Sequence, residues 1–339
     1  MGHRASYAIK ENGAVSYYYS HWGAKRIQAD FFFGPEPTLE LIRATRKDER
    51  LLTDVWGEGG ACIDLDTKHL LVFGSAEIEA SVRNLWLEML PFAWRGWTTC
   101  WANYGMVSLA DYLQVPMEEV LESEPISDEY IQISDETKVV DLNDPDHWID
   151  TVISIKSLDG NILDVVSDHL PDFLLASGEI ALINYLRRCP LYSPEKQKAP
   201  CCLSSIYMDI KQKKIIANIG NRDTIDYTLE KALKLAWPGW DFQGHCQDLE
   251  YHWSISGRDA SFLSVPLDKL ISRLRGIVVS TNEIDPHELI SKIEESGSTT
   301  SSVNPYFFDT YSLNLDQAKR QQFFDHVVAQ WRDKTRRLP

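Results

Sequence analysis

The feature that most constrains the fold is an internal repeat, because the stretch Ile63–Trp97 is copied by the stretch Met208–Trp240. In each copy, two strand-like runs flank a polar turn, an amphipathic run follows, and a tetrapeptide with a tryptophan at both ends closes the unit. The apolar positions of the two amphipathic runs correspond with an offset of 147, as between Ile78 and Ile225. A repeat of this length predicts two domain-sized halves and not a solenoid.

The match extends toward the start of each copy. Ile9–Gly13 corresponds to Ile155–Gly160, and the run that begins at Pro35 corresponds to the one that begins at Gly178. The sequence therefore predicts an α+β protein of two tandem pseudo-repeats, each hairpin-helix-hairpin-helix, followed by C-terminal helices. The alternative is that two unrelated hairpin-helix segments look alike.

Composition and turn signals place the domain boundaries. We expect a first α+β repeat over residues 1–116, an acidic linker over 117–150, a second α+β repeat over 151–284 and a C-terminal helical segment over 285–339. Within these, Asn12-Gly13 predicts a tight hairpin over 6–20. Further expected elements are a strand over 29–34, a helix over 38–52, and a helix from 266 that leads into a strand-like run.

The overall charge favours a basic protein partner. Of 339 residues, 50 are Asp or Glu and 34 are Lys or Arg, which gives a formal charge of −16. A field of this sign disfavours nucleic acid and anionic membranes as partners. The first residues lack the apolar core of a signal peptide, so we expect a cytoplasmic protein with reduced thiols. Met1-Gly2 with Ser6 also fits a myristoylation pattern, which is short and common.

No motif predicts a cofactor or a metal. The chain lacks the GxSxG, HExxH, CxxC and Walker patterns. The Gly-rich stretch 56–60 precedes a strand-like run, whereas a phosphate loop precedes a helix, so a turn is the better interpretation. His245, Cys246 and His252 lack a fourth ligand at zinc spacing, and the adjacent Cys201-Cys202 is expected to be structural.

One cluster of reactive side chains remains as a candidate pocket, formed by Arg4, His21 and Glu58. Histidine carries protons near neutral pH, and arginine can bind a carboxylate or a phosphate through two hydrogen bonds. An enzyme or small-molecule sensor with a pocket between the repeats would use them. The other interpretation is that the histidine is a structural residue at the end of a strand.

The acidic linker is the second candidate site. A run of charges is usually a solvated surface. Its carboxylates could instead dock into a basic cleft of a partner, where complementary charge speeds association. The candidate partner-binding residues are Glu119, Glu122, Glu124, Asp128, Glu129, Tyr130, Asp135 and Glu136.

Tryptophans recur at corresponding places in the two copies. Core packing is the preferred interpretation of this recurrence, and a recognition surface is the alternative, because Trp, Tyr and Arg dominate binding hot spots. The residues concerned are Trp94, Trp97, Trp101, Trp237 and Trp240.

The opening MGHRASY, the segment YYYSHWGA and the pair WGEGGACIDLD and WRGW resemble a bacterial family of proteins that begin with MGHRA and contain YSHWGA. Some members resemble immunity partners of polymorphic toxins, including Rhs-type toxins with an ADP-ribosyltransferase tip. The resemblance covers the first copy only and brings no catalytic pattern with it. It implies a non-enzymatic cytoplasmic inhibitor that covers the active site of a cognate toxin in interbacterial competition. The acidic charge of the chain favours a basic toxin.

Overall fold

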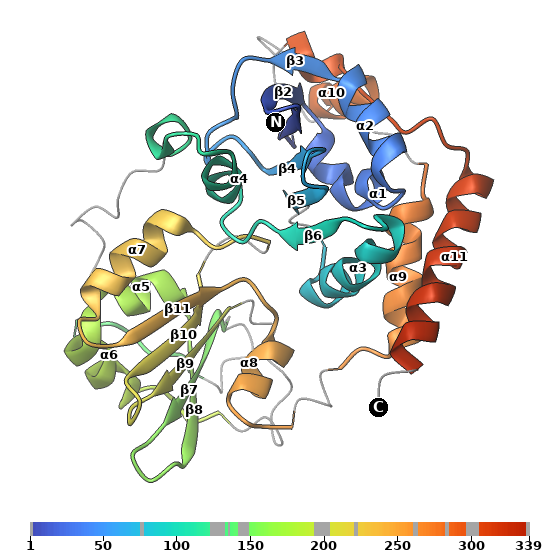
Figure 1. The fold of residues 1–339 in the computed structure, drawn as a ribbon. Coiled ribbons are helices and arrows are strands. Elements are labelled where there is room, and N and C mark those ends of the chain that lie inside the picture. The colour runs from blue at the N-terminus through green and yellow to red at the C-terminus, as the bar shows by residue number, and fades with distance from the viewer. Residues whose placement is uncertain are drawn as a thin grey trace. The chain divides into compact units, whose positions relative to one another are not determined.

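The computed structural model divides the chain into two compact units, which are described separately (Figure 1). Unit 1 combines Met1–Glu122 with Pro266–Pro339, and unit 2 is Ser123–Val265. The structure describes residues 3–74, 78–122, 133–134, 136–141, 149–192, 204–219, 223–259, 264–281, 285–295 and 305–336.

Unit 1 contains a six-stranded sheet in the order β3-β2-β1-β4-β5-β6. The pairs β1–β4 and β5–β6 are parallel, and the other neighbours are antiparallel. The predicted hairpin is confirmed, since Asn12 (φ 54°) and Gly13 (φ 76°) supply the positive φ angles between β1 and β2. The strands are β1 (Ala5–Glu11), β2 (Ala14–Ser20), β3 (Arg46–Asp48), β4 (Gly59–Asp64), β5 (His69–Gly74) and β6 (Thr98–Trp101).

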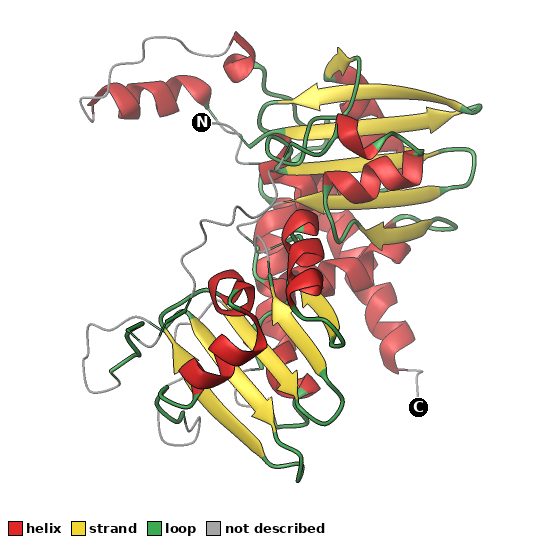
Figure 2. Ribbon diagram, turned by 90° about the vertical axis from the view of Figure 1, so that its left-hand side faces the viewer, coloured by secondary structure: helices red, strands yellow, loops and turns green. Residues whose placement is uncertain are grey.

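Helices lie against this sheet (Figure 2). The main core joins the sheet to α1, α2, α3, α9 and α11, and a second apolar cluster joins it to α4. The helical elements of unit 1 are η1 (Gly23–Arg26), α1 (Ile27–Phe31), α2 (Pro35–Ala44), α3 (Ala80–Ala93), α4 (Met106–Leu113), η2 (Met117–Glu119), α9 (Leu267–Val279), α10 (Pro286–Glu295), η3 (Pro305–Phe308) and α11 (Gln317–Arg336).

Unit 2 contains a five-stranded sheet in the order β11-β10-β9-β7-β8. The core between this sheet and α5, α6 and α7 is separate from a smaller cluster that includes Trp253 of α8. The elements are β7 (Thr151–Lys156), β8 (Ile162–Ser167), α5 (Pro171–Ala176), α6 (Gly178–Leu186), β9 (Ser204–Asp209), β10 (Lys214–Asn218), α7 (Tyr227–Ala236), β11 (Asp241–His245) and α8 (Leu249–Ile255).

The two sheets share one strand order and one pattern of directions. In unit 2, β7–β9 and β10–β11 are parallel, while β7–β8 and β9–β10 are antiparallel. These pairings repeat those of β1, β2, β4, β5 and β6, and unit 1 adds β3 at one edge. The α+β class is therefore confirmed, and a common origin of the two units stays a prediction.

Three expected elements are wrong. Residues 29–34 were expected as a strand, but α1 occupies Ile27–Phe31, because a short buried apolar run such as Phe31–Phe33 has no period of its own. The helix expected over 38–52 ends at Ala44, where the Thr45 hydroxyl donates to the Ile42 carbonyl and the chain enters β3. The strand-like run after residue 275 continues α9 through Val279.

The division into units also differs from the sequence-based boundaries, which placed residues up to 284 in the second repeat. Residues from Pro266 onward belong to unit 1. The reason is hydrophobic: Ile271 and Leu274 of α9 and Phe324 of α11 are buried in the main core of unit 1.

Candidate functional site

Arg4, His21 and Glu58 meet at one end of the sheet of unit 1, where β1 and β4 begin and β2 has just ended. The Arg4 carbonyl accepts hydrogen bonds from the N–H groups of Glu58 (3.0 Å) and Gly59 (3.1 Å). The N–H of His3 donates to the carbonyl of His21 at 3.0 Å. The sequence therefore identified residues that lie close together in unit 1, and the proposed pocket between the repeats stays a prediction.

His21 is buried at this end of the sheet. It is 1% exposed, and its Nδ1 lies 3.0 Å from the hydroxyl of Tyr19. Its ring packs edge-on against Trp22 (5.1 Å between centroids) and is tilted against Phe307 (5.6 Å). A substrate would have to displace these rings to reach the imidazole.

Arg4 and Glu58 are engaged at the surface. The guanidinium of Arg4 lies 4.6 Å from the centre of the Trp56 ring, which is a cation–π contact. The Glu58 carboxylate lies 3.2 Å from Nδ1 of His3. Both contacts involve residues of one loop, Thr53–Glu58, which leads into β4.

This loop presents two large apolar side chains to solvent: Val55 is 52% exposed and Trp56 is 47% exposed. The Thr53 carbonyl closes a turn in this loop, because it accepts hydrogen bonds from the N–H groups of Trp56 (3.1 Å) and Gly57 (2.9 Å). Its exposed side chains are therefore held on an ordered backbone. An exposed tryptophan is notable because most of its large apolar surface is usually covered.

The start of the acidic segment is bonded to the same loop. The Thr53 hydroxyl donates to the Glu122 carboxylate at 2.6 Å, and the Glu122 N–H donates to the Asp54 carboxylate at 2.8 Å. The Asp54 N–H donates to the carbonyl of Val120 at 2.8 Å, which places Glu119, the preceding residue, beside the loop. We call this region the acidic–aromatic surface; it comprises Arg4, Asp54, Val55, Trp56, Glu58, Glu119 and Glu122.

The remaining candidate residues of the acidic linker lie in unit 2 or outside the described residues. Glu136 belongs to unit 2, in a segment that the Arg188 guanidinium fixes by donating to the carbonyls of Ser134 (3.0 Å) and Thr137 (3.1 Å). The candidates that lie outside the described residues are Glu124, Asp128, Glu129, Tyr130 and Asp135.

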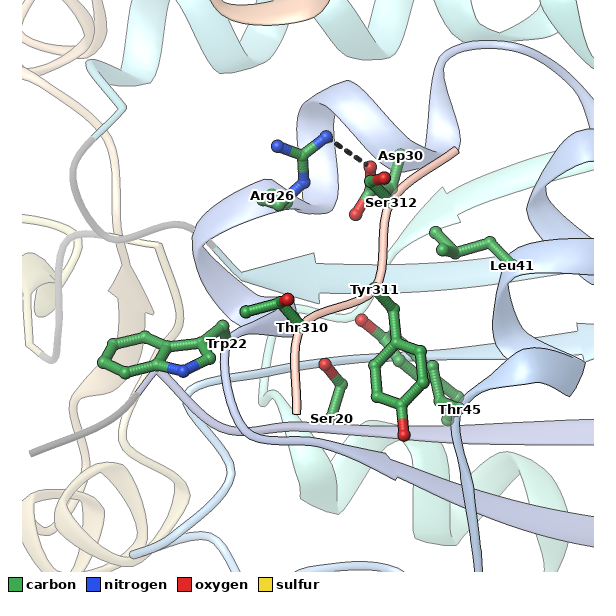
Figure 3. Close-up of a pocket in the computed structure, with 11 residues that line it drawn as sticks. Ser20, Trp22, Arg26, Asp30, Leu41, Thr45, Thr310, Tyr311 and Ser312 are labelled. Atoms are coloured by element: carbon green, nitrogen blue, oxygen red, sulfur yellow. Dashed lines mark hydrogen bonds and ion pairs between the residues drawn. The ribbon is translucent and has the colours of Figure 1, made fainter. Parts of the chain in front are cut away.

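A small pocket of unit 1 lies beneath the segment Thr310–Ser312 (Figure 3). Its volume of about 30 Å³ has room for about one water molecule. Arg26 and Asp30 lie on its wall with 3.3 Å between the guanidinium and the carboxylate. Burial raises the pKa of Asp30 to about 6, against the opposing effect of Arg26. The pocket is too small for an organic substrate.

The candidate metal ligands His245, Cys246 and His252 lie in the described part of unit 2. The Cys246 thiol donates to the Asp223 carbonyl at 3.3 Å. Among the residues that the structure describes, no three His, Cys, Asp or Glu side chains gather in a group able to hold a metal ion. Cys201 and Cys202 lie outside those residues. In the same described part of the chain, no helix combines the length and the apolar character needed to cross a membrane.

Sequence reasoning missed Val55 and Trp56. It tested residues 56–60 only as a phosphate loop, and the structure agrees with the turn interpretation, since β4 begins at Gly59. The available signal was the pair of large apolar residues inside a polar, glycine-containing loop, where no periodic element would bury them. Comparison of the chain with protein-family models, curated proteins and solved structures gave no match.

Proposed function

We propose that this protein is a non-enzymatic immunity protein, which binds a cognate antibacterial toxin in the cytoplasm and neutralises it by occluding its active site. The observation that carries the proposal is the exposure of Val55 and Trp56 on an ordered loop bordered by carboxylates. Tryptophan is enriched among the few residues that supply most of the binding energy of an interface. An apolar centre with a charged border is the usual arrangement of such a surface.

The charge of the chain supports a basic partner. Residues 117–150 contain twelve Asp or Glu and one Lys, and the whole chain carries −16. A field of this sign attracts a positively charged protein and raises its association rate. The Glu122 carboxylate, which accepts from Thr53, extends this field to the loop that carries the apolar centre.

The contacts of the candidate pocket residues also support a binding protein. His21 is buried between aromatic rings, Glu58 is paired with His3, and Arg4 lies on Trp56. A general acid or base must reach its substrate, whereas these side chains stabilise the end of the sheet and one loop. The alternative, an enzyme or small-molecule sensor with a pocket between the repeats, would require at least one of them to act on a ligand.

The decisive experiment is co-expression of the protein with the product of the neighbouring reading frame, followed by affinity purification and a growth assay. We expect a stoichiometric complex and restored growth. Trp56→Ala should raise Kd by about 30-fold or more, as at an interface hot spot. Leu158→Ala is the matched control because Leu158 is 71% exposed in unit 2; it should change Kd less than about threefold.

The outcomes separate the two functions. Absence of both complex and rescue would refute the immunity function. Rescue that requires Arg4 and Glu58 but survives Trp56→Ala would favour the enzyme or sensor. Circular dichroism of each variant confirms that the fold is retained.

A further inference from the structure

Unit 2 contains two buried histidines that the proposed function does not use. His245 ends β11 and is 5% exposed, and His252 lies on α8 and is fully buried. Among the residues that the structure describes, one ring nitrogen of each has no hydrogen-bond partner: Nε2 of His245 and Nδ1 of His252. Buried polar atoms without partners are rare in folded proteins and call for a physical explanation.

The hydrogen bonds of His252 define its tautomer. The Ser154 hydroxyl lies 2.5 Å from the Asp164 carboxylate, which can only accept, so Ser154 donates there. Its oxygen then accepts from Nε2–H of His252 at 2.9 Å. His252 therefore carries its proton on Nε2 and keeps Nδ1 bare. Protonation would place a positive charge on a ring that has no solvent contact.

A backbone hydrogen bond defines the same Nε2–H tautomer for His245. The N–H of Gln247 donates to Nδ1 of His245 at 3.1 Å, so Nδ1 must be unprotonated and Nε2 carries the proton. Gln247 immediately precedes Asp248, the residue whose side chain caps α8 by accepting from the Tyr251 N–H. A second proton on His245 would oppose the Gln247 N–H and break this bond at the entry to α8.

We propose that His245 and His252 form an acid-sensitive contact, which holds α8 on the sheet of unit 2 while both rings are neutral and releases it when they take up protons. The two rings act at different places on one helix. His245 fixes the turn before its N-terminus, and His252 fixes its buried side through Ser154 of β7.

The charges around the pair do not offset these protons. Asp164 of β8 already forms an ion pair with Arg258, and Asp209 of β9 forms one with Lys156. Asp248 caps α8. Glu250 of α8 has the opposite effect on stability. Burial raises the pKa of its carboxyl group, so the folded state binds a proton on Glu250 more readily than the unfolded chain does. Acid therefore stabilises the folded state through one group, Glu250, and destabilises it through two histidines.

The direction of the pH effect follows from the titrations. Burial lowers the pKa of His245 to about 4 and that of His252 to about 3, and the charge of His245 lowers the latter further. Their pKa values in an unfolded chain are about 6.5. The contact is therefore fully formed above about pH 6.5 and weakens as the pH falls toward about 4. Within this pH window, each histidine shifts the equilibrium between docked and released α8 by up to about tenfold per pH unit.

Hydrogen exchange on the full-length protein tests the proposal. Peptides covering Leu249–Ile255 should lose protection by roughly 100-fold to 1,000-fold between pH 7.5 and pH 5.0, after correction for the intrinsic exchange rate. The variant H245Q/H252Q should abolish most of this difference, since a glutamine amide can donate to Ser154 and cannot take up a proton. His326→Gln is the control, because His326 is exposed on α11 in unit 1; it should leave the difference unchanged.

A second measurement uses only the wild-type protein, so it does not depend on the correct folding of a variant. Ring ¹⁵N NMR of the wild-type protein should show both histidines as neutral Nε2–H tautomers down to about pH 5. Titration of either ring near pH 6.5 with α8 still protected would overturn the proposal, and so would equal loss of protection in wild type and H245Q/H252Q.

Discussion

Lys10 and Asp64 are partners across the parallel pair β1–β4, with 3.0 Å between the ammonium and the carboxylate. Asp64 also accepts from the Tyr112 hydroxyl at 2.9 Å and from the N–H groups of Asp66 and Thr67. Unit 2 has the same arrangement at the same place: Lys156 and Asp209 face each other on β7 and β9 at 3.3 Å. The carboxylate therefore fixes both the parallel pairing and the following turn.

Replacing Asp64 should test this double role. Burial raises the pKa of Asp64, but the hydrogen bonds from Lys10, Thr67 and Tyr112 outweigh it and hold the pKa below its ordinary value. The charge thus stabilises the folded state above about pH 4, and the contribution is lost as the pH falls through the folded pKa. At pH 7, Asp64→Asn should cost about 1–3 kcal/mol in urea unfolding. An unchanged unfolding midpoint would contradict this role.

The sequence predicted the elements whose signals are local. Asn12-Gly13 defined the first hairpin, and the apolar faces that contain Trp86 and Leu233 defined α3 and α7. The predictions from sequence were wrong where tertiary contacts determine the secondary structure. Phe31–Phe33 has no period, and Arg46–Asp48 forms a strand only because β2 offers it an edge. The position of α9 in unit 1 depends on a core assembled from distant segments, which no local pattern encodes.

The candidate site was predicted in part, for a similar reason. The sequence marks Arg4, Glu58, Glu119 and Glu122 as charged, but it cannot show that Thr53 and Asp54 bond to the segment near Val120. Trp56 was not predicted as exposed because burial depends on which elements cover a loop. The preferred core interpretation of the recurrent tryptophans agrees with Trp94 and Trp237, which are at most 1% exposed.

These two tryptophans make equivalent hydrogen bonds. Nε1–H of Trp94 donates to the Phe31 carbonyl at 2.7 Å, and Nε1–H of Trp237 donates to the Leu175 carbonyl at 2.8 Å. Trp94→Phe and Trp237→Phe each remove this buried hydrogen bond and leave a cavity, so each should cost about 2–4 kcal/mol. Chemical denaturation measures the loss. Trp56→Phe, a change at an exposed site, should cost less than about 0.5 kcal/mol.

The charge at the acidic–aromatic surface should act on the association rate. Glu119→Lys should slow association with the cognate partner by about tenfold at low salt, because it reverses an exposed charge on the segment that bonds to the loop Thr53–Glu58. Glu40→Lys makes the same charge change on α2, where Glu40 is exposed, and should have a smaller effect. Surface plasmon resonance at low and high salt measures both. Equal effects of the two variants would show that only the net charge matters.

Asp30 gives unit 1 a pH dependence opposite to that of the histidines of unit 2. The carboxyl group is 3% exposed, and burial raises its pKa to about 6 although Arg26 and Arg320 act against this. A raised pKa means that the folded state binds the proton more tightly than the unfolded chain does. The contribution to stability is therefore fully present below about pH 3.8 and is lost as the pH rises through about 6.

The consequence is measurable as a difference between wild type and Asp30→Asn. Lowering the pH from about 7 to about 4 should stabilise unit 1 of the wild type by about 2–3 kcal/mol relative to the variant, which cannot titrate at this position. Hydrogen exchange of peptides from α1 and β1 isolates this effect from unit 2, because these elements pack in the core of unit 1. A difference between the two proteins that stays constant over this pH range would mean that Asp30 is ionised throughout it, and that Arg26 compensates its burial in full.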